Sequence, residues 1–395
     1  MAKRNQMSYD DGYPMDAAPV KKKKKKGGLL GRIIRRFFLL VFTVVILAVT
    51  ALCLVMNLVF NGPSPAARQV LTMSLTEASA TKWVPGLFMD DETVAEIRKN
   101  VEFELPEEVS DTSSVVINKD HALSGAGSEF ANCPDGIYIE EISGATYNAH
   151  VMIIQDPSRV YMATSTDGKF SESIPGTRIT DEIVTEGAIA AINAGAFNDD
   201  GTAGTQVGSV PAGLTIHGGQ VVSDQYKGLV PEQGFCGFNN ENKLVVAETM
   251  TAEQAMEQNI RDGCEFGPVL IVNGVPNQKV YSGNSGYNPR TVVGQRADGV
   301  VIFVCADGRQ AGSLGATYKD MIDILVSYGA VNACNMDGGS SSVMLYNDVD
   351  GRYADRDYHD IDSSETVKMV NNYSVLQSKP RRMPNFWMVR PASEG

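Results

Sequence analysis

The sequence predicts an α+β fold in which a mixed β-sheet with flanking helices follows one transmembrane helix. An uncharged apolar run at residues 37–60 predicts the membrane helix. From about residue 135 onward, short apolar segments alternate with glycine turns, a pattern typical of strands. Two later segments, 251–261 and 317–328, have the apolar spacing of a helix. Because strands dominate over these two helices, we expect the α+β class.

The apolar run is long enough to cross a membrane. It contains 24 residues, whereas about 20 helical residues span the hydrocarbon core of a bilayer. Lys21 to Lys26 and three arginines precede the run, and residues 61–67 behind it carry no charge. This asymmetry predicts a single-pass protein of the cell membrane with a cytoplasmic N-terminus and an extracellular main domain. The basic segment also suits contact with anionic lipid.

Two other interpretations of the N-terminal region stay open. A cleaved signal peptide has an apolar core of about 7–15 residues, which is shorter than this run, although Pro65-Ala66-Ala67 offers a cleavage site. The lysine run alone would also suit nuclear import or nucleic-acid binding. Its position directly before a spanning helix favours the membrane anchor.

The chain divides into four predicted segments. They are a basic cytoplasmic tail (1–36), the transmembrane helix (37–60), a stalk or linker with a short helix (61–134) and a large domain (135–395).

The two sides of the predicted anchor carry opposite charge. The first 36 residues hold 11 Lys and Arg against 3 Asp and Glu, a net of +8, which leaves −21 for the remainder of a chain whose total is −13. An acidic exterior domain does not bind nucleic acid through bulk charge, so we expect no nucleic-acid partner. An anionic substrate would need local arginines.

The cysteine and histidine pattern predicts neither a metal nor a cofactor. Of six cysteines, Cys53 lies in the apolar run and five lie beyond it, without a CxxC or a zinc-type Cys/His spacing. The four histidines are scattered along the chain. One disulfide is compatible with the sequence, but its pairing and the oligomeric state stay open.

Beyond the anchor, each element is placed by its apolar pattern and its glycine or asparagine turns. A stalk helix is expected at 93–101 and a buried strand after a helix end at 183–192. Thr251 is a plausible cap for the first domain helix, and Gly329 ends the second. Strands are expected at 136–142, 147–154, 159–163, 213–222 (a hairpin), 269–272, 300–305, 331–337 and 343–346.

The strongest local signal is the segment from Asn335 to Ser342, Asn-Met-Asp-Gly-Gly-Ser-Ser-Ser. A buried strand ends in the carboxylate of Asp337, and Gly338 and Gly339 follow. Two glycines let the backbone approach a ligand closely and can present successive N–H groups to an oxyanion. A tight turn capped by serines is the plainer alternative.

Four other predicted strand boundaries also combine a polar residue with glycine or proline. They are Asn193-Ala-Gly-Ala-Phe, Glu265-Phe-Gly-Pro, Asn-Pro-Arg290-Thr and Asp307-Gly-Arg309. Each one alone suits an ordinary surface turn. Together they predict one pocket rimmed by Asn193, Glu265, Arg290, Asp307, Arg309 and Asp337. Carboxylates beside arginines fit acid–base work on an anionic substrate.

The order of these motifs resembles the phosphodiester glycosidase family over about residues 135–390. The matching segments are NAGAFNDDG, PAGLTIHGGQVV, FGPVLIVNG, NPRTVVGQ, DGR and NMDGGSSS. Two of them depart from the family pattern: Asn193-Ala-Gly-Ala-Phe stands for the usual Asn-Gly-Gly-Phe-Phe, and Ser340 stands for a third glycine. The resemblance implies hydrolysis of a sugar-1-phosphodiester at its glycosidic bond, which releases a free sugar and a phosphomonoester.

The resemblance also implies roles for the pocket residues. We expect Asp337 and Asp307 to supply the nucleophile or base and to stabilise oxocarbenium charge, with Glu265 as a third candidate. We expect Arg290 and Arg309 to hold the phosphodiester. The N–H groups of Gly338, Gly339 and Ser340 would assist, and Asn193 would hold a sugar hydroxyl or water.

The expected partner is a glycan or sugar-phosphate in cell-wall or exopolysaccharide material, with N-acetylglucosamine as the model sugar. Two alternatives remain. One is a non-catalytic glycan-binding or wall-assembly protein that uses the same pocket. The other is a calcium-stabilised loop at residues 198–201, whose spacing is not that of an EF-hand.

Overall fold

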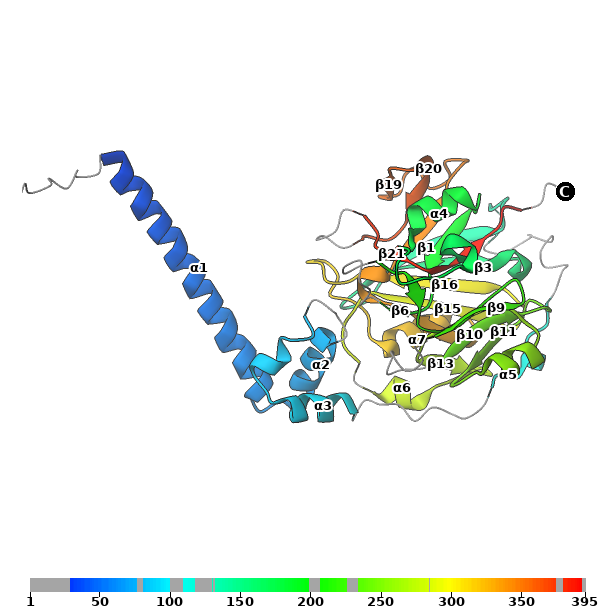
Figure 1. Ribbon diagram of the computed structural model, residues 1–395, viewed down its shortest axis with the longest axis horizontal. Coiled ribbons are helices and arrows are strands. Elements are labelled where there is room, and N and C mark those ends of the chain that lie inside the picture. Colours follow the sequence, from blue (N-terminus) through cyan, green and yellow to red (C-terminus); the bar gives the residue numbers. More distant parts are fainter. Residues whose placement is uncertain are drawn as a thin grey trace, which may run out of the picture. The chain divides into compact units, whose positions relative to one another are not determined.

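A computed structural model describes residues 29–76, 81–99, 109–117, 130, 132–198, 207–225, 234–283, 285–373 and 379–392. The chain forms two units, Met1–Met56 and Asn57–Gly395. The first unit is described from residue 29 onward, where it is part of helix α1 (Leu29–Asn61), and the last turn of this helix belongs to the second unit (Figure 1).

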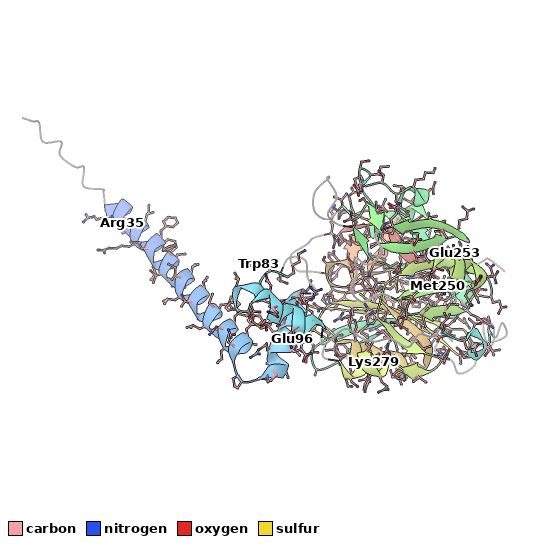
Figure 2. The ribbon with its side chains drawn as sticks, turned by 60° about the horizontal axis from the view of Figure 1, so that its bottom comes forward. Arg35, Trp83, Glu96, Met250, Glu253 and Lys279 are labelled. Carbon is pink, nitrogen blue, oxygen red and sulfur yellow. The ribbon has the colours of Figure 1, made fainter. Side chains whose placement is uncertain are left out.

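Helix α1 is longer than the predicted spanning segment. It begins at Leu29 rather than at residue 37, because Arg32, Arg35 and Arg36 are helix formers and extend it toward the N-terminus. Arg35 is exposed on this helix (Figure 2). Residues Gly31–Asn61 are long and apolar enough to cross a membrane, and none of the central window is buried against protein.

The segment predicted as a stalk contains several helices. It contains α2 (Pro65–Thr76) and α3 (Asp91–Lys99), with short 3₁₀ helices at Pro85–Leu87 and Thr112–Ser114. Asp90 caps α3 by accepting the N–H of Thr93 at 2.7 Å, and the exposed Trp83 and Glu96 lie in this region (Figure 2). The N–H of Tyr287 donates to Ser74 Oγ at 3.0 Å, so α2 contacts the large domain directly.

The large domain is built on three sheets of antiparallel pairs (Figure 1). The seven-stranded sheet has the order β1 (Ile137–Ser143), β2 (Asn148–Ile154), β16 (Val301–Ala306), β15 (Arg290–Arg296), β17 (Ala330–Met336), β13 (Val269–Val272) and β14 (Val275–Pro276). The five-stranded sheet has the order β11 (Leu244–Ala247), β10 (Phe235–Asn239), β12 (Ile260–Glu265), β8 (Gly213–His217) and β9 (Gln220–Gln225).

The six-stranded sheet has the order β19 (His359–Ile361), β20 (Ser364–Met369), β18 (Met344–Asn347), β5 (Ala190–Asn193), β22 (Asn385–Val389) and β3 (Val160–Thr164). Two small ribbons complete the fold: β4 (Thr177–Arg178) with β21 (Arg382–Met383), and β6 (Phe197–Asn198) with β7 (Val210–Pro211). Further 3₁₀ helices are Pro157–Arg159, Ser165–Gly168 and Gly339–Ser341.

The core lies on both faces of the seven-stranded sheet. On one face Phe303 joins Phe238 and Trp387 from the other two large sheets, and the rings of Phe238 and Trp387 meet edge to face at 5.5 Å. On the other face the sheet packs against Met321 and Leu325 of helix α7. Burial on both faces explains why β16 is a continuous apolar run rather than an alternating one. The α+β class is confirmed.

The domain helices are α4 (Ile179–Thr185), α5 (Ala252–Glu257), α6 (Gln278–Ser282) and α7 (Tyr318–Ser327). The prediction for 317–328 is confirmed, with Thr317 and Asp320 forming a capping box. The prediction of helix to residue 261 is wrong. Helix α5 ends at Glu257 because Asn259 takes a left-handed backbone conformation, after which Ile260 begins a strand that pairs with β10.

Candidate active site

Three strand termini meet at one edge of the seven-stranded sheet. Strand β15 lies between β16 and β17 and is antiparallel to both, with Arg290 opposite Ala306 and Thr291 opposite Met336. Asp307 and Asp337 follow directly where β16 and β17 end. The antiparallel register therefore brings Arg290, Asp307 and Asp337 to the same edge, as the strand pattern predicts.

Asp337 is half-buried and is held through its backbone. Its N–H donates to the carbonyl of Ala194 at 3.0 Å, and its own carbonyl accepts the side-chain amide of Asn193 at 2.6 Å. One carboxylate oxygen accepts the N–H of Gly338 at 2.9 Å. The Asp337 side chain is thus fixed at its base while part of it faces solvent.

The glycines after Asp337 are required by close packing on Pro289. A Cβ on Gly338 would lie 2.9 Å from the Pro289 carbonyl oxygen, and Gly339 has a φ of +62°. The Gly339 N–H donates to that same carbonyl at 2.9 Å. Since the Gly338 N–H is bonded to Asp337, both N–H groups make contacts within the protein. The role expected for the N–H groups of Gly338, Gly339 and Ser340 stays a prediction, and the first two already have partners within the protein.

Asp307 is buried, with 1% of its surface exposed. Its carboxylate accepts the backbone N–H of Asn372 at 3.0 Å and the Asn372 side-chain amide at 3.1 Å. Nε2 of His150 lies 3.6 Å from the same carboxylate. His150 is itself buried, and neither of its ring nitrogens has a hydrogen-bond partner among the described residues. Asp307 therefore fastens the segment around Asn372 to the sheet edge.

Arg309 is exposed and lies against the glycine turn. Its backbone has a φ of +57°, one Nη donates to Asn288 Oδ1 at 2.8 Å, and a Cβ on Gly339 would come within 3.2 Å of the other Nη. A cavity of about 20 Å³ lies between the two strand ends and is lined by Asp307, Arg309, Ser340 and Asn372 among others. That volume holds about one water molecule, so a sugar would have to bind over the turn rather than inside this cavity.

Arg290 is placed differently from Arg309. It is 4% exposed, and its guanidinium lies 3.8 Å above the Tyr318 ring. Its Nε donates to the Ala316 carbonyl at 3.2 Å, and one Nη donates to the Gly286 carbonyl at 3.0 Å. These contacts tie β15 to the start of α7. The expectation that Arg290 holds the phosphodiester stays a prediction, and these contacts favour a structural role.

Asn193 and Glu265 also make extensive contacts within the protein. Asn193 is fully buried, and its Oδ1 accepts Thr291 Oγ1 at 2.8 Å and the Val343 N–H at 3.2 Å. Because its amide also donates to the Asp337 carbonyl, Asn193 positions the Asp337 backbone. Glu265 accepts the Leu214 N–H at 2.9 Å and packs on Gly213, where a Cβ would lie 2.2 Å from its carboxylate.

A second group of residues near Asp337 has no counterpart in the sequence analysis. Tyr373 donates its hydroxyl to the Ser340 carbonyl at 2.6 Å and accepts the N–H of Arg381 at 3.2 Å. Burial raises the pKa of Tyr373, the positive charges of Arg381 and Arg178 oppose that rise, and the charge of Asp337 adds to it. The only sequence signal was the basic pair Arg381-Arg382 after Pro380.

The described residues contain no group of three or more His, Cys, Asp or Glu side chains that could hold a metal ion. The loop proposed for calcium lies outside the described residues beyond Asn198. None of the cysteines in the described part of the chain forms a disulfide. Burial raises the pKa of Cys236, Cys264 and Cys305 well above the usual value.

The α+β domain thus brings a partly buried carboxylate, Asp337, and an exposed arginine, Arg309, to the same edge of one sheet. Residues 186–390 match the model of the phosphodiester glycosidase family. The chain belongs to this family.

Two kinds of relative extend the comparison. The SPbeta prophage-derived uncharacterized protein YomE of Bacillus subtilis (strain 168) is 28% identical over 171 residues, which are 42% of this chain and 25% of that protein. The match thus spans about a quarter of that relative.

Among solved structures, the catalytic domain of zebrafish N-acetylglucosamine-1-phosphodiester alpha-N-acetylglucosaminidase, auto-inhibited by its pro-peptide, is similar with a TM-score of 0.50. It is 17% identical, and the similarity covers 68% of this chain and 87% of that one. A hypothetical protein from Synechocystis has a TM-score of 0.42 at 14% identity, over 64% of this chain and 62% of that one. At these identities the likeness to the zebrafish domain shows a shared fold.

Proposed function

We propose that this protein is a membrane-anchored, extracytoplasmic glycosidase that hydrolyses a sugar-1-phosphodiester at its glycosidic bond. The observation that carries the proposal is the position of the partly buried Asp337 directly before the Gly338-Gly339 turn, against which the guanidinium of the exposed Arg309 lies. In a member of the phosphodiester glycosidase family, this pairing offers a carboxylate for the sugar and a cation for the phosphate.

The two groups divide the chemistry. Asp337 acts as the nucleophile or base, or stabilises the oxocarbenium charge that develops at the anomeric carbon. Arg309 binds the phosphate oxygens, for which a planar guanidinium is suited. Because phosphate is a good leaving group, a strong general acid is less necessary than in ordinary glycosidases. The bond between the anomeric carbon and the phosphate oxygen breaks, water supplies the new hydroxyl, and the phosphomonoester leaves.

The remaining predicted residues support these two. In this proposal Asp307 holds Asn372 at the pocket wall, Asn193 fixes the backbone of Asp337, and Glu265 fixes the Gly213 turn. Ser340 lines the pocket, and its carbonyl accepts Tyr373. We assign Arg290 to the structural contact between β15 and α7. Of the two arginines predicted to hold the phosphodiester, only Arg309 then contacts the substrate.

The substrate we propose is an N-acetylglucosamine-like sugar-1-phosphate esterified to a second alcohol. The name of the zebrafish enzyme supplies the first sugar to test. Cell-wall polymers and exopolysaccharide are the materials outside a cell in which such linkages would be met. The basic residues between positions 21 and 36 support the proposed position of the domain on the outer side of the membrane.

The test uses the full-length protein in detergent micelles and a panel of sugar-1-phosphodiesters, with release of free N-acetylglucosamine as the measured quantity. Activity in the wild type that is lost in Asp337→Asn supports the proposal. Binding of the same compounds without release of sugar would overturn it and would favour the non-catalytic glycan-binding alternative. A reporter fused after Gly395 tests the topology, and activity of that reporter only inside the cell would contradict it.

A further inference from the structure

A pair of arginines, Arg178 and Arg381, lies near Tyr373, whose hydroxyl contacts the turn that follows Asp337. Strand β4 pairs with β21 so that Arg178 lies opposite Arg382. A guanidinium nitrogen of Arg178 donates to the carbonyl of Pro380, the residue directly before Arg381. Segments that are about 200 residues apart in the chain therefore place Arg178 and Arg381 next to each other.

Arg381 is connected to the turn at residues 338–340 by two successive hydrogen bonds. The backbone N–H of Arg381 donates to the hydroxyl of Tyr373 at 3.2 Å, and that hydroxyl donates to the carbonyl of Ser340 at 2.6 Å. The Arg381 guanidinium lies 4.6 Å from the centre of the Phe197 ring, and Phe197 ends the Asn193-Ala-Gly-Ala-Phe motif. Arg381 thus touches a second motif that borders Asp337.

The electrostatic effects on Tyr373 agree with this placement. Burial is the largest influence and raises the pKa of Tyr373, the charges of Arg381 and Arg178 lower it, and the charge of Asp337 raises it. Both guanidinium groups and the Asp337 carboxylate therefore act on one phenol. Among the described ion pairs, no carboxylate is paired with Arg178, whose side chain is half-buried.

The position of these cations is unusual for the part of the chain beyond residue 36, which carries a net charge of −21. A phosphodiester has a single negative charge, and Arg309 at Gly339 already offers one guanidinium for it. Two more arginines near the same carboxylate exceed what one diester needs. A ligand with a second anionic group would use them.

We propose that Arg178 and Arg381 form an anion subsite beside Asp337 that binds a second phosphate on the aglycone side of the substrate. The inference rests on the proposed function and deepens it. It assigns the substrate class to sugar-1-phosphates whose leaving group carries a further phosphate, such as a sugar diphosphate ester or a phosphate-linked polymer. Phe197, under the Arg381 guanidinium, holds that arginine in place by a cation–π contact.

The test compares two probes that differ in the number of phosphates: methyl N-acetylglucosamine-1-phosphate and UDP-N-acetylglucosamine. Binding is measured by titration calorimetry with the full-length protein in the Asp337→Asn background, so that no turnover is needed. We expect Arg178→Gln and Arg381→Gln each to weaken binding of the two-phosphate probe about tenfold. Binding of the one-phosphate probe should stay nearly unchanged.

Three controls make the outcome decisive. Arg382→Gln removes an exposed arginine of the same ribbon that donates to the Gly176 carbonyl at 2.8 Å, and it should leave both affinities unchanged. Arg309→Gln should weaken both probes. Arg178→Lys and Arg381→Lys keep the charge and should recover part of the affinity, which separates charge loss from misfolding.

Two results would overturn the subsite: equal weakening of both probes in Arg178→Gln and Arg381→Gln, or no weakening of either. Failure of the proposed function has a different signature, because it is absence of sugar release by the wild type on any phosphodiester. Calorimetry on the subsite variants and the hydrolysis assay on the wild type therefore report the two failures separately.

Discussion

The ends of strands β16 and β17 have the same local sequence pattern but different surroundings. Each ends in Asp-Gly, and both flank β15. After β16 the carboxylate of Asp307 is buried under Asn372, and the exposed group is Arg309, two residues on. After β17 the residue Asp337 is only partly buried. The comparison teaches that the same strand-end Asp-Gly pattern can give a buried or a partly exposed aspartate, depending on the segment that packs over it.

The largest effect should come from Asp337→Asn, which tests the exposed end of the comparison. The substitution keeps the shape and removes the charge, so we expect kcat to fall by at least about 100-fold. Little stability should be lost, because the backbone contacts to Asn193 and Ala194 remain. Steady-state kinetics and thermal melting of the same preparation measure both quantities. Near-normal turnover would refute the role given to Asp337.

Asp307→Asn tests the buried carboxylate and should reduce stability more than it reduces turnover. The new amide faces donors from Asn372, so a buried hydrogen-bonded group is lost, at a cost of about 1–3 kcal/mol in the free energy of unfolding. Turnover should fall less than in Asp337→Asn. Urea unfolding measures the loss of stability, and a kinetic assay of the same preparation measures the loss of turnover. A loss of kcat as large as that of Asp337→Asn, with full stability, would show that Asp307 acts on substrate.

The convergence of these strand ends could be predicted from the sequence, but the surroundings of each could not. Apolar runs followed by Asp-Gly mark the ends of β16 and β17, and antiparallel neighbours bring them to one edge. The stacking of Arg290 on Tyr318 depends on how α7 packs against the sheet. The contact of Asp307 with Asn372 joins residues 65 apart in the chain. The proximity of Arg178 and Arg381 could not be predicted from the sequence either, because the two-residue strands β4 and β21 that bring them together carry no periodic signal.

Substitution of the two arginines at this edge should have smaller effects, on activity for Arg309 and on stability for Arg290. Arg309→Gln should lower kcat/KM for a phosphodiester about tenfold, which is the loss of roughly one charge-assisted hydrogen bond, and should matter much less for a neutral glycoside. Arg290→Gln should instead lower the free energy of unfolding by about 1–3 kcal/mol, through lost backbone and ring contacts. Kinetics on both substrates and urea unfolding check this. A phosphodiester-specific loss in stable Arg290→Gln would restore Arg290 to the site.

The smallest effect concerns the pair His217 and Asp262. The His217 side chain is partly exposed, in contrast to the buried pair His150 and Asp307. Nδ1 of His217 lies 3.7 Å from Asp262 Oδ1 and 2.6 Å from the Met162 carbonyl, and the side chain is 41% exposed. Hydrogen bonding to Asp262 raises the pKa of His217, burial opposes the rise, and the Met162 carbonyl and Glu186 add to it.

Because the pKa is higher in the folded state, protonated His217 stabilises the fold fully below the unfolded value of about 6.5. That stabilisation is lost as pH rises through the folded pKa. Wild type should therefore melt higher than His217→Gln at pH 5.5, and the difference should shrink at pH 8.5. Since solvent screens the pair, we expect a difference of a few degrees at most. The matched variant His150→Gln, at the buried pair, should lower turnover through Asp307. A melting difference for His217→Gln that grows with pH would contradict the assigned sign.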